Sequence, residues 1–389
     1  MYCRRPPEKF HNFPVLARRA IFQIHVWIGV VTGLYIFLVC TTGAALVFRI
    51  DMQRALHPDL FTPTTSGPTA HPAEILESVQ RAFPGERVSG ADAPTTGRPT
   101  YLAYSSSGNR FRTLLLDPAS ARLLGELNDT SFVRTLQDLH FDLLTGRTGR
   151  RVNGVGALLL LTMCLTGLVI WWPDRSNWWR RIRVEFSRPW RRVIWELHGA
   201  AGFWTVLFIA MWALTGLYFT FPAVFRSAIN RISPLTIART PQSGPRGDAA
   251  PPTWRELIDR ARQHAPADHF VARVVTPSND TAAFLVMFAD ERPTPLGADL
   301  TSVYLDQYTG ALLATPAAAS TLGDAIMAWV VPLHVGNFRG TALRVVWMLL
   351  GLTPPLLFVT GFTMWWIRVV RPRSRAPQRA GAISASRDE

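Results

Sequence analysis

Four of the nine histidines stand at matched positions in a sequence that repeats itself. "RRAIFQIH" ends at His25 and "RRVIWELH" ends at His198, while His140 and His334 are each followed, at identical offsets, by a Thr-Gly pair and by two adjacent tryptophans. A neutral imidazole nitrogen is a common metal ligand. We therefore expect the four to act in pairs around a metal-containing cofactor. The other five lack a counterpart and are expected to be ordinary surface or packing residues: His11, His57, His71, His264 and His269.

The elements that must position these histidines are long apolar stretches. The chain has 389 residues, 48% of them hydrophobic, with 14 tryptophans. A bilayer-spanning helix needs ~20 mostly apolar residues. Four stretches meet this length and are predicted to be transmembrane helices: 21–48, 153–172, 193–221 and 342–367. The first lacks a small-residue cleavage site and is interpreted as a retained helix rather than a signal peptide.

The arginines predict the orientation of these helices. Short segments rich in Lys and Arg stay on the cytoplasmic side of a membrane. This rule predicts cytoplasmic tails at 1–20 and 368–389 and a cytoplasmic loop at 173–192, and it places the connections 49–152 and 222–341 in the periplasm of a bacterial inner-membrane protein. The net charge of +14 lies mostly beside the membrane, so we expect no nucleic-acid partner but contact with lipid.

The repeat extends over the whole chain. Counted from His25 and His198, a Thr-Gly pair falls at the same offset in both copies, and the outer segments repeat as well: a helix opened by proline, at 72–85 and 252–266, precedes β-rich sequence with a turn at Asp117 or Asp306. The predicted fold class is therefore membrane α-helical, a duplicated four-helix transmembrane bundle with two small α+β modules in the periplasm.

The direction of each helix sorts the histidines into two layers. His25 and His198 follow cytoplasmic arginine pairs and should face each other near the inner side, whereas His140 and His334 precede helices that run inward and should meet near the outer side. Facing imidazoles in a four-helix bundle can bind the iron of a b-type haem from both axial sides, so two bis-His b-type haems are predicted. The alternative is that these histidines merely anchor helix ends at the lipid headgroups.

Six glycines share the faces of these histidines and would make room for a porphyrin. Gly167 and Gly361 should reach the inner pair, and Gly43 and Gly216 the outer pair, about five turns along the helix from His25 and His198. Gly29 and Gly202 follow the inner histidines by one turn. The alternative reading of small residues in such spacing is close helix–helix packing.

Two matched arginines stand on the outer side, against the charge rule. Arg150 and Arg344 lie at the same offset from His140 and His334. The planar guanidinium group suits carboxylates, so both are candidates to bind the propionates of the outer haem, with headgroup contact as the alternative. The sequence has no C-x-x-C-H motif for covalent haem attachment and no dinucleotide-binding glycine motif, so the electron donor must be external, either a membrane quinol or a cytoplasmic reductase.

These motifs resemble a known family. "RRxIxxxH", "LHFDLLTGRTGR" and the Thr-Gly-x-x-x-Trp-Trp endings, placed around two outer modules, are similar to the PepSY-associated transmembrane family, which itself resembles inner-membrane iron-regulated proteins and ferric-siderophore reductases. The resemblance implies an oxidoreductase that reduces a ferric siderophore in the periplasm, with His25, His198, His140 and His334 as haem ligands. The second copy departs from the pattern at "LHVGNFRGTALR" and at Pro354-Pro355.

Two other classes of function stay open at this point. PepSY modules resemble propeptide-type inhibitors, so a regulatory or inhibitory membrane protein without redox activity is one alternative. A metal or proton transporter that uses the histidines as a path is another, although acidic side chains are scarce in the four predicted helices. The colour of the purified protein would separate all three.

Overall fold

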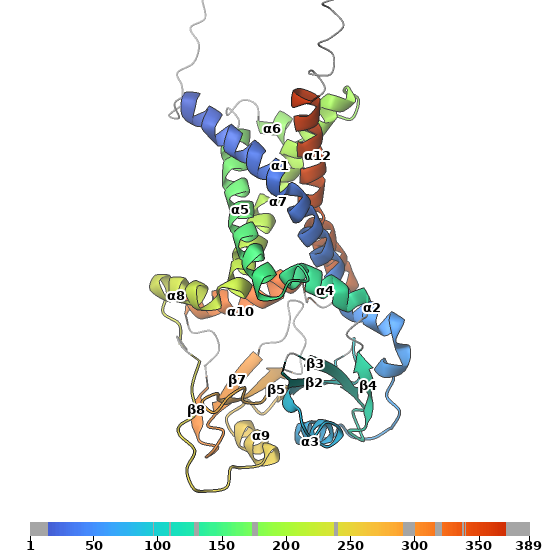
Figure 1. Ribbon diagram of the computed structural model, residues 1–389, viewed down its shortest axis with the longest axis vertical. Coiled ribbons are helices and arrows are strands. Elements are labelled where there is room, and N and C mark those ends of the chain that lie inside the picture. The colour runs from blue at the N-terminus through green and yellow to red at the C-terminus, as the bar shows by residue number, and fades with distance from the viewer. Residues whose placement is uncertain are drawn as a thin grey trace, which may run out of the picture. The chain divides into compact units, whose positions relative to one another are not determined.

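The computed structural model describes residues 15–95, 97–108, 110–127, 132–172, 178–236, 240–290, 300–315, 321–336, 338 and 340–370. The predicted tails and the loop 173–192 lie partly outside these residues. The chain divides into two compact units (Figure 1). A helical unit contains the residues up to Ala44, Leu139–Thr220 and the residues from Trp347 on; a sheet unit contains Ala45–Asp138 and Phe221–Val346.

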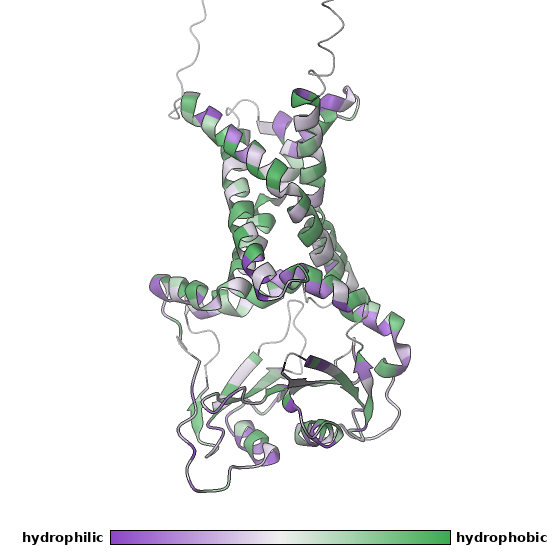
Figure 2. Ribbon diagram, in the orientation of Figure 1, coloured by the Kyte–Doolittle hydropathy of each residue, from purple (hydrophilic) through white to green (hydrophobic). Residues whose placement is uncertain are grey.

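The helical unit consists of long apolar helices. Four stretches of the described chain are long and apolar enough to cross a membrane: Leu16–Leu46, Arg147–Trp171, Trp190–Thr220 and Thr341–Val369. Hydrophobic residues predominate along these helices (Figure 2). The expected membrane α-helical class is therefore confirmed in its coarse form. The helices of the unit are α1 (Val15–Leu46), α5 (Arg147–Trp171), the short α6 (Trp178–Arg181), α7 (Trp190–Thr220), the end of α11 (Thr341–Gly351) and α12 (Thr353–Val369).

The fourth apolar stretch is two helices rather than one. α11 ends at Gly351 and α12 begins at Thr353, directly before Pro354 and Pro355. Proline has no amide hydrogen and clashes with the preceding helical turn, so two adjacent prolines are tolerated only where a helix starts. The Thr353 hydroxyl donates to the Leu350 carbonyl at 2.7 Å and so satisfies part of the broken turn. The helix is therefore interrupted next to the proline pair at which the second copy was expected to depart from the first.

The sheet unit is built on one eight-stranded antiparallel sheet with the strand order β4-β3-β2-β1-β5-β6-β7-β8. Each predicted outer segment supplies four neighbouring strands. The first segment gives β1 (Arg87–Asp92), β2 (Tyr101–Ser107), β3 (Arg110–Leu116) and β4 (Leu123–Leu127); the second gives β5 (His269–Val275), β6 (Phe284–Asp290), β7 (Leu300–Leu305) and β8 (Leu312–Ala314). The two segments thus share one sheet where two separate modules were expected.

The two halves of the sheet join through β1 and β5. Gly90 pairs with Val275 and Asp92 with Arg273, whose guanidinium forms an ion pair with the Asp92 carboxylate. Gly90 has a φ of 144°, and a Cβ atom there would lie 2.2 Å from the Val274 carbonyl oxygen. Only glycine permits this backbone and this close approach. The central seam therefore depends on one residue without a side chain.

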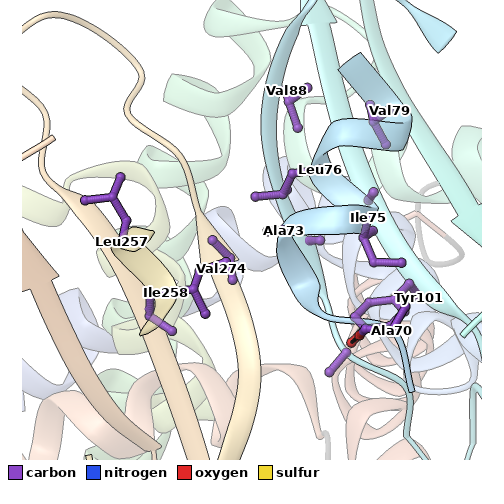
Figure 3. Packing of buried hydrophobic residues seen from close by; sticks show 14 of the residues in the cluster. Ala70, Ala73, Ile75, Leu76, Val79, Val88, Tyr101, Leu257, Ile258 and Val274 are labelled. Atoms are coloured by element: carbon purple, nitrogen blue, oxygen red, sulfur yellow. Dashed lines mark hydrogen bonds between the residues drawn. The ribbon is translucent and has the colours of Figure 1, made fainter. Parts of the chain in front are cut away.

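Two helices cover one face of the sheet. α3 (Pro72–Ala82) and α9 (Trp254–Arg262) bury Ile75, Leu76 and Ile258 in one continuous core with both halves of the sheet (Figure 3). Pro72 lies in the first turn of α3 as expected. In α9 the expectation was wrong, because Pro252 precedes the N-cap residue Thr253, which forms a capping box with Glu256.

Asp117 and Asp306 hold matched turns between the last two strands of each half. Asp117 accepts hydrogen bonds from the amides of Ala119, Ser120, Thr64 and Thr65, and Asp306 from the amides of Tyr308, Thr309 and Gly244. Burial alone would raise the pKa of each carboxyl, but the hydrogen bonds outweigh it and hold both pKa values below their usual range. Each aspartate thereby ties the linker that enters its half of the sheet to the turn.

Shorter helices connect the two units along the chain. α2 (Arg49–Leu56) and the 3-10 helix η1 (Pro58–Phe61) follow α1, α4 (Phe132–Asp142) precedes α5, α8 (Pro222–Ile232) follows α7, and α10 (Leu322–Val335) precedes α11. Within the sheet unit, α8 contacts α10, and the side chain of Ser233 accepts a hydrogen bond from the amide of Gly323 at 2.9 Å.

Candidate cofactor site

His25 of α1 and His198 of α7 face each other inside the helical unit. Their ring centroids are 6.5 Å apart and their planes are nearly perpendicular, at 87°. Each histidine lies about two to three turns into a helix that has an arginine pair near its start and continues as an apolar stretch. The two copies of the octapeptide therefore bring their terminal histidines together, although 172 residues separate them in the sequence between positions 25 and 198.

Both rings are held by a threonine of a different helix. His25 Nδ1 lies 3.0 Å from the hydroxyl oxygen of Thr166 in α5, and His198 Nδ1 lies 2.9 Å from that of Thr360 in α12. Thr166 and Thr360 are the first residues of the Thr-Gly pairs. A contact between these threonines and the histidines was not expected from the sequence, although the threonines stand at equal offsets from His140 and His334.

The glycines that follow these threonines leave room for the same rings. A Cβ atom at Gly167 would lie 3.1 Å from His25 Cε1, and one at Gly361 would lie 3.0 Å from His198 Cε1. These separations are shorter than ordinary van der Waals contact between carbon atoms. Each histidine is thus enclosed by a Thr-Gly pair, with the hydroxyl at one ring nitrogen and the missing side chain at the adjacent carbon.

His140, near the end of α4, has related surroundings in the same unit. Its Nδ1 lies 2.9 Å from the Val39 carbonyl oxygen of α1, and a Cβ atom at Gly43 would lie 2.7 Å from its Cε1. The Thr42 hydroxyl lies 3.5 Å from the same nitrogen. Its backbone is tied to the helical unit too, because Asn153 donates to the His140 carbonyl at 2.8 Å. The third Thr-Gly pair, Thr42-Gly43, therefore contacts the third histidine.

The fourth histidine is placed in the other unit. His334 lies near the end of α10, in the sheet unit, while Gly216 lies in α7 of the helical unit. The predicted pairing of His140 with His334, and the place of Gly216 beside it, therefore stay predictions.

Gly29 and Gly202 contact neighbouring helices rather than histidine rings. A Cβ atom at Gly29 would meet the Met163 side chain at 3.2 Å, and one at Gly202 would meet the Leu357 side chain at 3.7 Å. In α1, Gly33 is closer still to α12, where a Cβ atom would lie 2.1 Å from the Phe358 ring. These contacts are typical of close helix packing through small residues.

The matched arginines have different surroundings. The Arg150 side chain at the start of α5 is exposed. Arg344 of α11 forms an ion pair with Asp51 of α2, donates to the Val47 carbonyl at 2.9 Å and lies over the Phe48 ring, with 20% of its side chain exposed. A carboxylate of the protein itself therefore binds one of the two guanidinium groups that were predicted to bind propionates.

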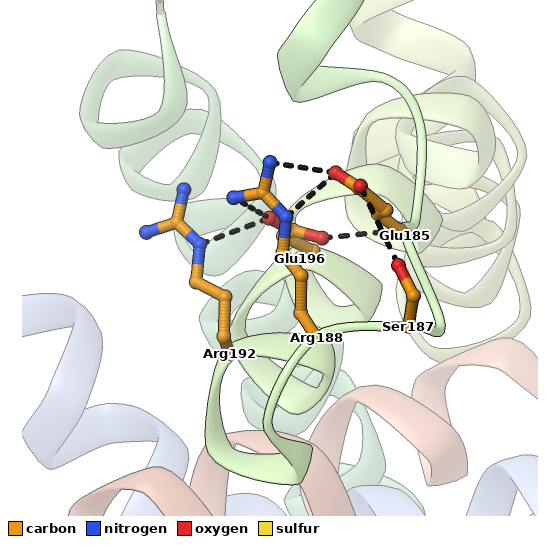
Figure 4. A network of polar contacts seen from close by, with 5 residues as sticks. All are labelled: Glu185, Ser187, Arg188, Arg192 and Glu196. Carbon is orange, nitrogen blue, oxygen red and sulfur yellow. Dashed lines mark hydrogen bonds and ion pairs between the residues drawn. The ribbon is translucent and has the colours of Figure 1, made fainter.

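A buried carboxylate stands two residues before His198. Glu196 is 7% exposed and accepts hydrogen bonds from Arg192 Nε at 2.9 Å and from the amide of Glu185 at 3.1 Å (Figure 4). Arg188 bridges Glu196 and Glu185, at 3.3 and 2.6 Å. The network fastens the segment before α7 to the first turns of that helix. At the equivalent position of the first copy, Gln23 is exposed.

The His25–His198 pair offers two imidazole ligands, which suits a metal whose remaining ligands come from a cofactor. Within the described part of the chain, no group of three or more His, Cys, Asp or Glu side chains could hold a metal ion. Two neutral imidazoles can still complete the coordination of a haem iron, whose other four ligands belong to the porphyrin.

The chain is similar in sequence to a known protein family and to an uncharacterised bacterial protein. Residues 22–368 match the family described as PepSY-associated TM region. The chain is also 25% identical over 266 residues to an uncharacterised protein of Pseudomonas aeruginosa, a match that includes 62% of this chain and 64% of the relative. The chain therefore spans less than two thirds of the length of that relative.

Proposed function

Because the chain belongs to the family of the PepSY-associated TM region, we propose that it is a haem-carrying oxidoreductase of the bacterial inner membrane. In this proposal the protein is a ferric-chelate reductase: it passes electrons across the membrane to a ferric siderophore, an Fe(III) chelate, in the periplasm. Its helices form a duplicated four-helix bundle, and each half of the sheet corresponds to one PepSY-like module. The donor is a quinol or a cytoplasmic reductase.

The single observation that carries this proposal is the His25–His198 pair. Two imidazoles bound through ring nitrogens on opposite sides of one metal, each about 2 Å from it, have centroids about 6 Å apart. The separation in the structure is 6.5 Å. Two helices of different copies hold the rings at that separation, inside a unit whose helices are apolar enough for a membrane. The inner pair therefore fits a bis-His b-type haem.

The residues of the chain have defined tasks in this function. His25 and His198 would hold the haem through their imidazole nitrogens, and a haem held by two histidines would supply one-electron transfer rather than oxygen activation. The apolar helices exclude water from the pair. The chelate gains one electron, Fe(III) becomes Fe(II), and hard oxygen donors hold the reduced ion much more weakly, so that the chelator is released intact.

The direct test is the absorption spectrum of the full-length protein purified from haem-replete cells. A Soret band that sharpens when dithionite is added, and a haem that is reoxidised by an added ferric hydroxamate, would support the proposal. The variant His198→Ala should lose this haem, and Gly202→Ala is the matched control on the same helix because Gly202 has ordinary contacts. A colourless parent protein would contradict the proposal.

The proposed orientation has its own test. Protease applied to spheroplasts should cut the sheet unit and leave the arginine-rich segment around Trp178–Arg181 intact. Cleavage in the opposite pattern would contradict the assignment of both termini to the cytoplasm.

A further inference from the structure

We propose that Thr166 and Thr360 are positioning residues that fix the tautomer of His25 and His198. In this assignment each Nδ1 carries the proton and each Nε2 keeps the free lone pair. The haem role of that lone pair rests on the proposed function, but the tautomer follows from the protein alone. No ligand is needed to set it.

Both threonine hydroxyl groups already donate a hydrogen bond within their own helix. The Thr166 hydroxyl lies 2.8 Å from the Thr162 carbonyl oxygen, and the Thr360 hydroxyl lies 2.8 Å from the Leu356 carbonyl oxygen. A carbonyl oxygen can only accept, and a hydroxyl has a single proton to donate. Each threonine hydroxyl therefore donates its hydrogen bond to a carbonyl of its own helix, and only its oxygen lone pairs are directed at the histidine.

The histidine must then be the donor. At 3.0 Å for His25 and 2.9 Å for His198, the ring nitrogen Nδ1 lies at hydrogen-bond distance from an oxygen that has no proton left for it. A neutral imidazole carries one N–H, so Nε2 is the unprotonated nitrogen. The i−4 hydrogen bond of a threonine in a helix thus determines which nitrogen of a histidine in another helix can bind a metal.

His140 reaches the same tautomer by a different route. Its Nδ1 lies 2.9 Å from the Val39 carbonyl oxygen, which can only accept. The Thr42 hydroxyl is directed to the Leu38 carbonyl at 2.9 Å and again has no proton for the ring. Three histidines on three helices are therefore held with Nε2 unprotonated, by two hydroxyl oxygens and one carbonyl oxygen.

This arrangement has a consequence for a metal at Nε2. A ligating histidine that donates its other N–H is fixed in orientation and is more basic, and loss of such a partner typically costs ~10–100-fold in metal affinity. A more basic ligand favours Fe(III) over Fe(II). Removing the threonine oxygen should therefore weaken haem binding and raise the midpoint potential of the inner haem.

The first arm of the experiment needs no haem. In full-length apoprotein labelled with ¹⁵N-histidine, we expect the NMR signals of His25 and His198 to report a protonated Nδ1 and an unprotonated Nε2. Thr360→Val keeps the shape of the side chain and removes the oxygen, so the His198 signal should shift toward the other tautomer. Thr360→Ser keeps the hydroxyl and should restore the parent signal.

The second arm measures haem content and midpoint potential in the same variants. Thr166→Val and Thr360→Val should lower the retention of the inner haem by about tenfold or more. A tenfold change in the ratio of Fe(III) to Fe(II) affinity corresponds to about 59 mV for one electron. Matched controls exist in both helices, since the half-buried Thr162 and Thr363 make the same i−4 hydrogen bond.

The outcomes separate this proposal from the function. Parent-like tautomers and midpoints in both valine variants would overturn the assignment and leave the haem function standing. If the parent protein binds no haem, the function fails, and the NMR arm alone decides the tautomer. Equal effects of Thr162→Val and Thr166→Val would also overturn the assignment, because only Thr166 contacts a histidine.

Discussion

His25 and His198 have closely matched surroundings, whereas the residues near them in the sequence differ. A hydroxyl oxygen lies at hydrogen-bond distance from Nδ1 of both His25 and His198, and a glycine borders Cε1 of each. Two residues before each histidine, Gln23 is exposed in the first copy, while Glu196 is buried in an arginine network in the second. This is the difference expected if both rings bind the one haem proposed above, because the ligand would require the same geometry from each histidine and none from the residues outside the site.

The helices that follow His140 and His334 in the sequence extend the contrast. α5 is continuous, while its counterpart is divided into α11 and α12; Arg150 is exposed, while Arg344 binds Asp51. The repeated sequence is therefore matched in structure around His25 and His198 but not along the helices that follow. Four groups of substitutions can test this conclusion.

Loss of a ligand should have the largest effect. His25→Ala and His198→Ala should each remove the same inner haem, because one iron needs both rings, and should leave the second haem spectrally intact. His140→Ala should do the reverse. Haem content by pyridine haemochrome and the Soret spectrum of each variant would measure this. If His25→Ala and His140→Ala removed the same haem, the assignment of two layers would be wrong.

Crowding of a histidine ring should have the next largest effect. Gly43→Ala would place a Cβ atom 2.7 Å from His140 Cε1, and Gly167→Ala one 3.1 Å from His25 Cε1. We expect Gly43→Ala to disturb its histidine more, since that ring is also held by a backbone carbonyl, and Gly202→Ala, at 3.7 Å from Leu357, to be neutral. Haem retention on dilution would rank the three variants. Equal retention in all of them would show that these glycines serve packing alone.

Substitution of the matched aspartates of the sheet should have a smaller effect, which concerns the stability of the fold and not haem binding. Asp117→Asn should lower the free energy of unfolding by about 1.5–3 kcal/mol, the value of charged hydrogen bonds, and Asp306→Asn by less, because Asp306 accepts fewer of them. Both pKa values are lowered in the folded protein, so this stability is present above about pH 4 and is lost as the pH falls through the folded pKa. Thermal unfolding between pH 7 and pH 3 would show whether the variants lose this dependence.

Removal of the outer arginines should have the smallest effect. Arg344→Ala and Asp51→Asn should each cost about 1 kcal/mol or less, the usual value of a partly exposed ion pair. If the Asp51 pair is the whole role of Arg344, both changes leave the outer-haem midpoint unaltered. If Arg344 also contacts a propionate, only Arg344→Ala shifts the midpoint in a redox titration. Arg150→Ala gives the comparison with the exposed arginine.

Much of this protein follows from its sequence alone. The apolar stretches predict the membrane helices because spanning a bilayer requires both length and composition. The equal offsets of the Thr-Gly pairs place Gly167, Gly361 and Gly43 on the faces that border histidines in the structure, since a helix converts offset into direction. The proline pair at 354–355 predicts the start of α12 because proline lacks an amide hydrogen.

Tertiary structure decided what depends on residues far apart in the chain. The sheet is continuous because β1 pairs with β5, a register that no local pattern records. The role of each threonine depends on where its oxygen meets a ring from another helix, and the fate of Arg344 depends on Asp51 in α2, which lies 293 residues earlier. A sequence gives each helix its faces through periodicity, but only packing determines which atom of a neighbouring helix each face meets.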